Sequence, residues 1–340
     1  MKNKRRLWGL SSAVGLLLLI LDSKTAITGG QEGIKLCFQT VIPALFPFFV
    51  FSGLACQSFL GENISILRPI GKLCRIPKGA ESLLLLGFLG GYPVGAKNIV
   101  TAEENGALTR IDAQRMMGFC NNAGPAFLFG MAGGLFESKV APWILWFIHI
   151  ISAILVGCIL PNKAVNHCKL PKNRTINFTE QMKNSIKTMG NICAWVMLFR
   201  VILTFLKKWF FFLIPTEIGV WVTGLTELSN GIIDLYSISN DGLRFILCAG
   251  FLGFGGVCVG MQTISITSKL GTGLYFPGKI IQGCISILIA YFLQFILFEG
   301  INIFSIPTYW LLVLLLGIGC CLYVIYPRKN NSGNLSKTYV

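Results

Sequence analysis

The sequence predicts an all-α, polytopic helical membrane protein with two related repeats, each containing a glycine-rich re-entrant or discontinuous segment. Three observations lead there: apolar residues make up 54% of the chain, they gather in long charge-free stretches, and only 13% of residues are charged. An ordinary soluble domain carries about 25% charged residues. So little charge cannot cover a soluble surface of this size, so lipid must be the solvent for much of it.

The charge-free stretches mark the expected membrane spans, because a helix needs about 20 residues to cross the hydrocarbon. They are 7–21, 36–61, 82–96, 116–136, 141–162, 245–268, 280–298 and 301–327, with a further apolar segment at 188–206. The first follows a basic start, so it is expected to be an uncleaved span with the N-terminus inside; a cleaved signal peptide is the alternative.

The basic excess points to a membrane rather than to nucleic acid. The net charge is +15, and the basic residues fall between the apolar runs, at 2–6, 68–78, 163–187 and 327–329. Cytoplasmic loops of membrane proteins carry such an excess of Lys and Arg. We therefore expect the lipid bilayer as a partner and no nucleic acid.

Cysteine and histidine usage gives no sign of a metal or another cofactor. The 12 cysteines include no CxxC pair, and the chain has only 2 histidines. A zinc site needs several such ligands at close spacing. We expect no metal and no cofactor. We expect His149 to satisfy one buried hydrogen bond, with a proton relay as the alternative.

The longest polar stretch divides the chain into halves. The expected divisions are a signal-anchor-like span with a short loop (1–32), a first Gate-like repeat (33–162), a basic cytoplasmic loop (163–187), a second Gate-like repeat (188–326) and a polar tail (327–340).

The segment 82–96 cannot form a good straight helix, because it holds Gly87, Gly90, Gly91, Pro93 and Gly95. Broken backbone is tolerated at membrane depth only where protein or water satisfies the freed polar groups. If this segment dips and returns, the basic loop 163–187 stays on the cytoplasmic side. We therefore expect a re-entrant or discontinuous segment.

A similar glycine cluster occurs in the second half. The letters GFLGGYPVG at 87–95 are matched by GFLGFGGV at 250–257, and Cys120 and Cys284 follow at similar spacing. Paired interrupted segments in two halves indicate a transporter site at the repeat interface. The alternative is that glycine only lets helices pack closely.

Polar groups inside the apolar stretches are the candidate site residues, because they are costly in lipid and usually functional. The Lys97 ammonium beside glycine-freed amides could form an anion site, or the side chain could snorkel to the interface. Arg200 could offset a substrate carboxylate or pair with Glu227, and it could also snorkel. The expected substrate-binding residues are Gly91, Tyr92, Gly95, Lys97, Asn121, Asn122, Gln262, Thr263 and Arg200.

Two further groups of polar residues each have two possible roles. Asn121 and Asn122 offer donors and acceptors to a polar ligand, or they cap a helix break. Glu227, Ser229 and Asn230 could bind a coupling ion, or the segment could be a helix N-cap at a membrane surface. The chain has no GxSxG elbow, Walker loop or HExxH motif, so we do not expect an enzyme.

Three motifs resemble a known family. The letters GYPVGAK at 91–97, FCNNAGPAFLFG at 119–130 and LFPFF at 45–49 resemble the YlbJ-like sporulation integral membrane proteins of the nucleoside-recognition (Gate) domain family. The resemblance covers about residues 35 to 325. The family often has NASNP where this chain has NNAGP at 121–125, so a glycine replaces a side chain that the family would offer.

The resemblance implies a secondary transporter of a small organic anion, dipicolinate during sporulation, in the bacterial cell membrane and specifically the outer forespore membrane. Lys97, the glycine amides and Arg200 would be suitable partners for this planar dianion. Two alternatives stay open: a carrier of a nucleoside or another neutral solute coupled to a cation, and a non-transporting membrane scaffold of a sporulation complex. A homo-oligomer also stays open.

Overall fold

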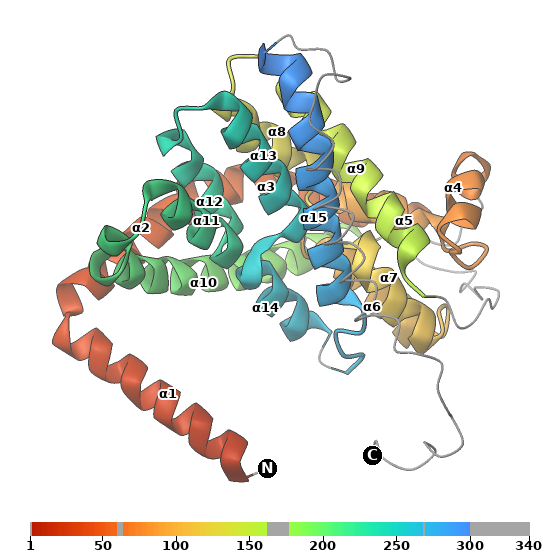
Figure 1. Cartoon of the computed structure of the whole chain (residues 1–340). Helices are drawn as coiled ribbons and strands as arrows, with labels where there is room; N and C mark the ends of the chain where they lie inside the picture. Colours follow the sequence, from red (N-terminus) through yellow and green to blue (C-terminus); the bar gives the residue numbers. More distant parts are fainter. Residues whose placement is uncertain (1, 60–63, 162–176, 268, 300–340) are drawn as a thin grey trace, which may run out of the picture.

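The computed structural model describes residues 2–59, 64–161, 177–267 and 269–299. Every regular element in these residues is a helix, which confirms the predicted all-α class (Figure 1). The span expected at 301–327, the tail at 327–340 and most of the basic loop at 163–187 lie outside the described residues.

The described residues contain 5 helical segments that are long and apolar enough to cross a membrane. They are Ser23–Ala55, Ala141–Ile159, Phe178–Trp209, Asp241–Ile266 and Tyr275–Phe298. The last two and the second agree closely with the expected stretches. The chain is therefore a polytopic helical membrane protein.

The described part of the first half combines short helices with three helices of 18 to 20 residues. Its elements are α1 (Lys2–Leu21), α2 (Ser23–Leu36), the π-helix η1 (Cys37–Val41), α3 (Ile42–Phe59), the 3-10 helix η2 (Ser65–Leu67), α4 (Arg68–Leu73), α5 (Glu81–Gly90), α6 (Val94–Glu104), α7 (Arg110–Cys120), α8 (Pro125–Gly130), the 3-10 helix η3 (Ala132–Leu135) and α9 (Ala141–Ile159).

The second half begins with the longest helix. Its elements are α10 (Phe178–Trp209), the 3-10 helix η4 (Phe211–Leu213), α11 (Thr216–Thr226), α12 (Leu228–Asp234), the 3-10 helix η5 (Leu235–Ser237), α13 (Asp241–Phe254), α14 (Gly256–Ile266), α15 (Tyr275–Gln294) and the π-helix η6 (Phe295–Glu299).

The helix α2 lies antiparallel against α10. Asp22, just before α2, forms an ion pair with Lys208 near the end of α10, with 2.6 Å between Asp22 Oδ2 and Lys208 Nζ. Gly29 and Gly33 face α10 so closely that a Cβ added to either would lie 2.9 Å from an α10 Cα atom. Small residues four positions apart allow membrane helices this approach. Because η1 and α3 continue α2, the apolar stretch expected at 36–61 lies in a helical segment that begins at Ser23 and not at residue 36. The stretch expected as the first span, at 7–21, lies in α1 but is not among the 5 described segments long and apolar enough to cross a membrane.

The helix α15 joins the two halves of the chain. It packs against α13 of its own half, where a Cβ on Gly253 would lie 2.9 Å from the Gly283 Cα. It also packs against α7 of the first half, where a Cβ on Gly278 would lie 2.6 Å from the Gly118 Cα. Figure 1 shows α15 in blue between these groups of helices, whereas α1 extends away from them.

Four breaks interrupt the described helices at membrane-type apolar sequence. They separate α5 from α6, α7 from α8, α11 from α12 and α13 from α14. Gly91 and Gly255 lie in two of them with φ of 72° and 84°, a region that glycine adopts without the penalty of a side chain. Both expected glycine clusters therefore coincide with a helix break. The re-entrant path and the relation of the halves as repeats stay predictions.

Candidate functional site

The helix breaks surround one narrow cavity. Gly91 and Tyr92 line it from the first break, Gly124 from the second, Glu227 from the third, and Gln262 of α14 closes it. Its volume is about 40 Å³, with apolar side chains of α3 and α10 completing the wall. A space of this size holds a few water molecules, since one needs roughly 10–15 Å³ by this measure.

Backbone contacts between the breaks explain why glycine occurs there. A Cβ on Gly91 would lie 3.0 Å from the Gly124 nitrogen, and a Cβ on Gly255 would lie 3.0 Å from the Tyr92 hydroxyl. A Cβ on the neighbouring Gly256 would lie 3.3 Å from a backbone nitrogen of the α11–α12 break. The four breaks therefore contact one another directly. Glycine is needed at these positions because a larger side chain would prevent this close packing of the backbones.

Asn121 links the two halves at this point. Its side chain is fully buried; Oδ1 accepts from the Ala96 N–H at 3.2 Å, and Nδ2 donates to the Thr263 hydroxyl at 3.1 Å. Ala96 lies in the first turn of α6, where backbone N–H groups lack partners within the helix. Asn121 thus caps a helix break, which was one of its two expected roles. Gly95 permits this, because a Cβ there would lie 2.3 Å from the Cys120 carbonyl oxygen.

A lysine lies at the centre of the buried polar groups. Lys279 of α15 is 0% exposed, and its Nζ donates to the Asn121 carbonyl oxygen at 3.1 Å and to Asn122 Oδ1 at 3.4 Å. It also donates to Gln282 Oε1, while Gln282 Nε2 donates to Asn122 Oδ1 at 3.1 Å. These acceptors are all neutral. None of the ion pairs found among the described residues includes Lys279.

Tyr92 contacts both the cavity and this lysine. The Lys279 Nζ lies 5.0 Å from the centre of the Tyr92 ring, which is within the range of a cation–π interaction. The Tyr92 hydroxyl donates to the Leu252 carbonyl oxygen of α13 at 3.2 Å. One side chain from the first break therefore reaches α13, α15 and the cavity.

His149 extends the polar layer into α9. Its Nε2 accepts from the Ala123 N–H at 3.0 Å, which confirms the expected buried hydrogen bond. Further along α9 and α15, the Ser286 and Ser152 hydroxyls are hydrogen-bonded at 2.9 Å. The layer thus continues between α9 and α15 at a depth where the surrounding side chains are apolar.

Glu227 caps the helix that follows it. Its carboxylate accepts from the Ser229 N–H at 3.1 Å, the Asn230 N–H at 2.7 Å and Asn230 Nδ2 at 2.6 Å. A carboxylate is favoured at a helix N-terminus by these unpaired N–H groups and by the helix dipole. The expected group of Glu227, Ser229 and Asn230 is therefore brought together as an N-cap of α12, with Glu227 also lining the cavity.

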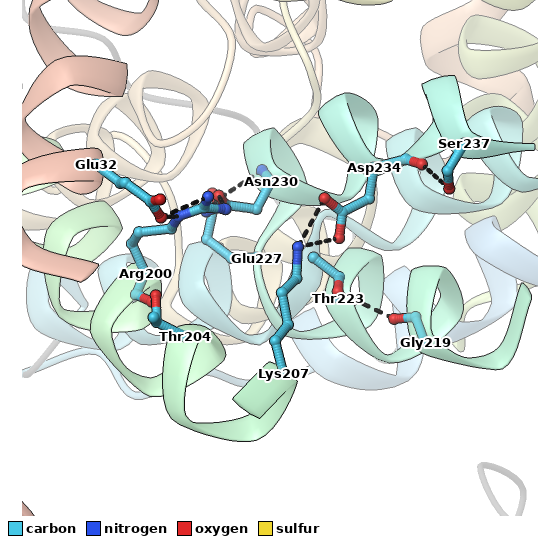
Figure 2. Close-up of polar contacts among 10 residues, drawn as sticks. All are labelled: Glu32, Arg200, Thr204, Lys207, Gly219, Thr223, Glu227, Asn230, Asp234 and Ser237. Atoms are coloured by element: carbon cyan, nitrogen blue, oxygen red, sulfur yellow. Dashed lines mark hydrogen bonds and ion pairs between the residues drawn. The ribbon is translucent and has the colours of Figure 1, made fainter. Parts of the chain in front are cut away.

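Arg200 pairs with a different carboxylate from the one expected (Figure 2). Its Nε and Nη2 donate to Glu32 Oε2 at 3.0 and 2.8 Å, and its Nη1 donates to Asn230 Oδ1. Of the alternatives for Arg200, the pairing with Glu227 is wrong, because the guanidinium pairs with Glu32. The packing of α2 along α10 places Glu32 beside the guanidinium, while the α12 N-terminus already occupies the Glu227 carboxylate. Arg200 does not line the cavity.

The remaining candidates divide between the cavity and its surroundings. Gln262 lines the cavity. Thr263 does not line it, but its hydroxyl accepts a hydrogen bond from Asn121 Nδ2. Lys97, the cation expected at the site, lies half-buried on α6 and does not line the cavity. Lys279 does not line the cavity either, but it is fully buried directly behind a residue that does, with its Nζ 5.0 Å from the centre of the Tyr92 ring.

Sequence reasoning missed Lys279 and Gln282. The charge-free stretch 280–298 leaves Lys279 out of the expected span, whereas α15 begins at Tyr275 and includes Lys279. The available signal was Pro277, because proline is favoured in the first turn of a helix. A helix start placed by that proline would have put Lys279 inside the span.

Comparison with curated proteins finds a relative along most of the chain. The chain is 24% identical over 318 residues to the sporulation integral membrane protein YlbJ of Bacillus subtilis (strain 168), covering 78% of this chain and 76% of the relative. This similarity confirms the predicted YlbJ-like assignment and, with the long apolar helices, an integral membrane protein. No protein-family model matches, and no solved structure matches. The Gate domain stays a prediction.

Proposed function

We propose that this YlbJ-like membrane protein is a secondary transporter of a small organic anion, which binds where the four helix breaks meet. The observation that carries the proposal is Lys279, fully buried with neutral hydrogen-bond partners only. A buried ammonium without an opposite charge is costly, and ionisable groups inside membrane proteins commonly mark substrate or ion pathways. An anionic substrate would supply the missing charge.

The neighbouring groups suit a carboxylate ligand. In this conformation the ammonium donates to Asn121, Asn122 and Gln282, and the two amides donate to other protein oxygens. A bound carboxylate would replace some of these acceptors, and the charge-assisted bonds that it would form are the stronger ones. The backbone N–H groups at the helix breaks add further donors. Because the cavity holds only about 40 Å³, this conformation is closed, and substrate entry requires the breaks to separate. Such movement of one half against the other is how alternating access proceeds in many carriers.

Dipicolinate during sporulation is the specific substrate that we propose, at the outer forespore membrane. The relative from Bacillus subtilis is named as a sporulation integral membrane protein. The motif resemblance implies dipicolinate, a planar dianion that matches a cationic, amide-rich site. Its planar ring also suits a site where an aromatic side chain, Tyr92, already lies on the ammonium.

A cation-coupled carrier of a nucleoside or another neutral solute is the second candidate. Glu227 favours it, because this carboxylate lines the same cavity and could hold a coupling cation or proton. The anion proposal has the stronger support, because Glu227 already receives three N–H donors whereas Lys279 has no charged partner among the described residues. A non-transporting membrane scaffold is the third candidate, and we propose that the protein is not an enzyme.

Uptake into proteoliposomes tests the proposal. Purified wild-type protein should carry labelled dipicolinate and not labelled uridine. Lys279→Met keeps the length of the side chain without its charge, and it should lower dipicolinate flux at least tenfold. Lys139→Gln, at an exposed position, is the matched control and should keep the flux.

The other results separate the alternatives. Uridine flux without dipicolinate flux would support the neutral-solute carrier. If correctly folded and inserted protein carried neither solute, the scaffold would gain support. Unchanged dipicolinate flux in Lys279→Met would remove the observation on which the anion proposal rests.

A further inference from the structure

A second, strongly basic cavity lies apart from the helix breaks. It is lined by Ser65 of η2, Arg68 and Lys72 of α4, and Lys78 in the loop before α5, and its volume is about 440 Å³. No carboxylate is among the residues that line it. Figure 1 shows α4 in orange at the edge of the molecule, away from α10 and α12.

A buried carboxylate holds this cavity together. Glu81, the first residue of α5, is 1% exposed and forms an ion pair with Arg68. Its Oε2 accepts from the Gly79 N–H at 2.7 Å, which fixes the loop that carries Lys78. Glu81 therefore neutralises one of the three cations and leaves the charges of Lys72 and Lys78, both exposed, without compensation from the cavity wall.

Apolar residues of the same segment are exposed beside the cavity. Ile66 is 83% exposed and Leu73 is 60% exposed, whereas Ile70 between them packs against the hydrophobic core. In contrast, Arg68 and Lys72, which line the cavity, are four residues apart, and helical spacing places them on the face opposite Ile66 and Leu73. A short helix with one apolar and one basic face is typical of the membrane interface.

We propose that this cavity binds the phosphate of an anionic phospholipid headgroup. Lys72 and Lys78 donate to the phosphate oxygens, and Arg68 forms the fixed edge of the site. Ile66 and Leu73 enter the adjoining acyl region. The basic stretch 68–78 is expected on the cytoplasmic side, where the leaflet surface is negative and basic pockets bind lipid headgroups. A free phosphate has the same oxygens, but only a lipid also covers the exposed apolar side chains.

Thermal unfolding of the full-length protein in a neutral detergent tests this site. Added phosphatidylglycerol should raise the Tm by about 3 °C or more, because a ligand that binds only the folded protein stabilises it. Phosphatidylcholine and inorganic phosphate should raise it much less. In the double variant Lys72→Gln/Lys78→Gln, most of the phosphatidylglycerol shift should be lost. The control double variant Lys139→Gln/Lys183→Gln, also at exposed positions, removes the same charge and should keep the shift.

Three results would overturn the proposal. An equal shift with phosphatidylcholine would show no recognition of the anionic headgroup. An equal shift with inorganic phosphate would make the site one for soluble anions. An undiminished phosphatidylglycerol shift in the Lys72→Gln/Lys78→Gln protein would place lipid binding elsewhere. Native mass spectrometry of retained phosphatidylglycerol gives an independent count in each variant, and none of these readouts depends on transport.

Discussion

Tyr92 combines two contacts that substitution can separate. Its ring lies 5.0 Å from the Lys279 Nζ, and its hydroxyl donates to the Leu252 carbonyl oxygen at 3.2 Å. A desolvated cation–π interaction contributes about 2 kcal/mol or more, and a typical hydrogen bond contributes about 0.5–1.5 kcal/mol. The ring should therefore matter more than the hydroxyl.

We expect Tyr92→Phe to lower the free energy of unfolding by about 1 kcal/mol and Tyr92→Leu to lower it by about 2–4 kcal/mol, because leucine also leaves a void beside a buried charge. Thermal unfolding of the purified proteins in detergent compares the two. If the Phe and Leu variants lost the same stability, the hydroxyl and not the ring would be the important contact.

The same residues show how far a sequence can locate a membrane site. Gly91 and Tyr92 were predicted because glycine and proline interrupt the apolar stretch locally. Lys279 and the Arg200–Glu32 pair were not, because both depend on packing between distant helices. Lys279 becomes buried only when α15 lies against the α7–α8 break. Charge-free stretches therefore predicted three of the long apolar helices closely, at 141–162, 245–268 and 280–298, and the apolar segment at 188–206 lies within a fourth. Local breaks predicted residues that line the cavity. The partners of the charged residues could be identified only from the packing of distant helices.

At the scale of helices, Arg115 of α7 holds the ends of two neighbours. Its Nη2 donates to the Cys74 carbonyl oxygen after α4 at 2.7 Å and to the Gly157 carbonyl oxygen near the end of α9 at 2.5 Å. Carbonyl groups at helix C-termini lack partners within the helix and favour a nearby cation. Arg115 is 3% exposed, so water cannot replace it.

Replacing Arg115 by Met should therefore destabilise the protein by about 2–4 kcal/mol, because several buried carbonyl oxygens lose a charged donor. Arg115→Lys should recover only part of this, since an ammonium cannot match the planar fork of donors. The Tm in detergent measures both variants. A lysine variant as stable as the wild type would mean that charge alone is sufficient at this position.

The contact between α2 and α10 offers a matched pair of glycines. A Cβ on Gly29 would lie 2.9 Å from an α10 Cα atom, whereas a Cβ on the adjacent Gly30 would meet nothing within 4 Å. Gly29→Ala should force the helices apart and lower the Tm. Gly30→Ala should keep or raise it, because alanine is favoured over glycine within a helix by about 0.5–1 kcal/mol. Equal Tm values for the two variants would argue against this helix contact.

On the scale of the whole molecule, these contacts place the described residues that flank the two basic loops at one end. Because α2 and α3 run antiparallel to α10, the end of α3 and the start of α10 lie together, as the hydrogen bond from Gln181 Nε2 to the Phe49 carbonyl oxygen at 2.9 Å indicates. Arg115 likewise joins Cys74 to Leu160 at the end of α9. The described segment from Ser65 to Lys78, the end of α9 and the start of α10 therefore share a side, as the distribution of positive charge requires.

We expect that side to be the cytoplasm, with the start of α9 on the opposite side. An impermeant maleimide applied to intact spheroplasts should label Lys139→Cys, and it should label Ser65→Cys and Thr179→Cys only after the membrane is opened. All three positions are exposed, so accessibility reflects the side of the membrane. Wild-type protein, with its native cysteines, gives the background. Labelling of Ser65→Cys and Thr179→Cys without opening would invert the orientation, and labelling of just one of them would contradict the antiparallel packing itself.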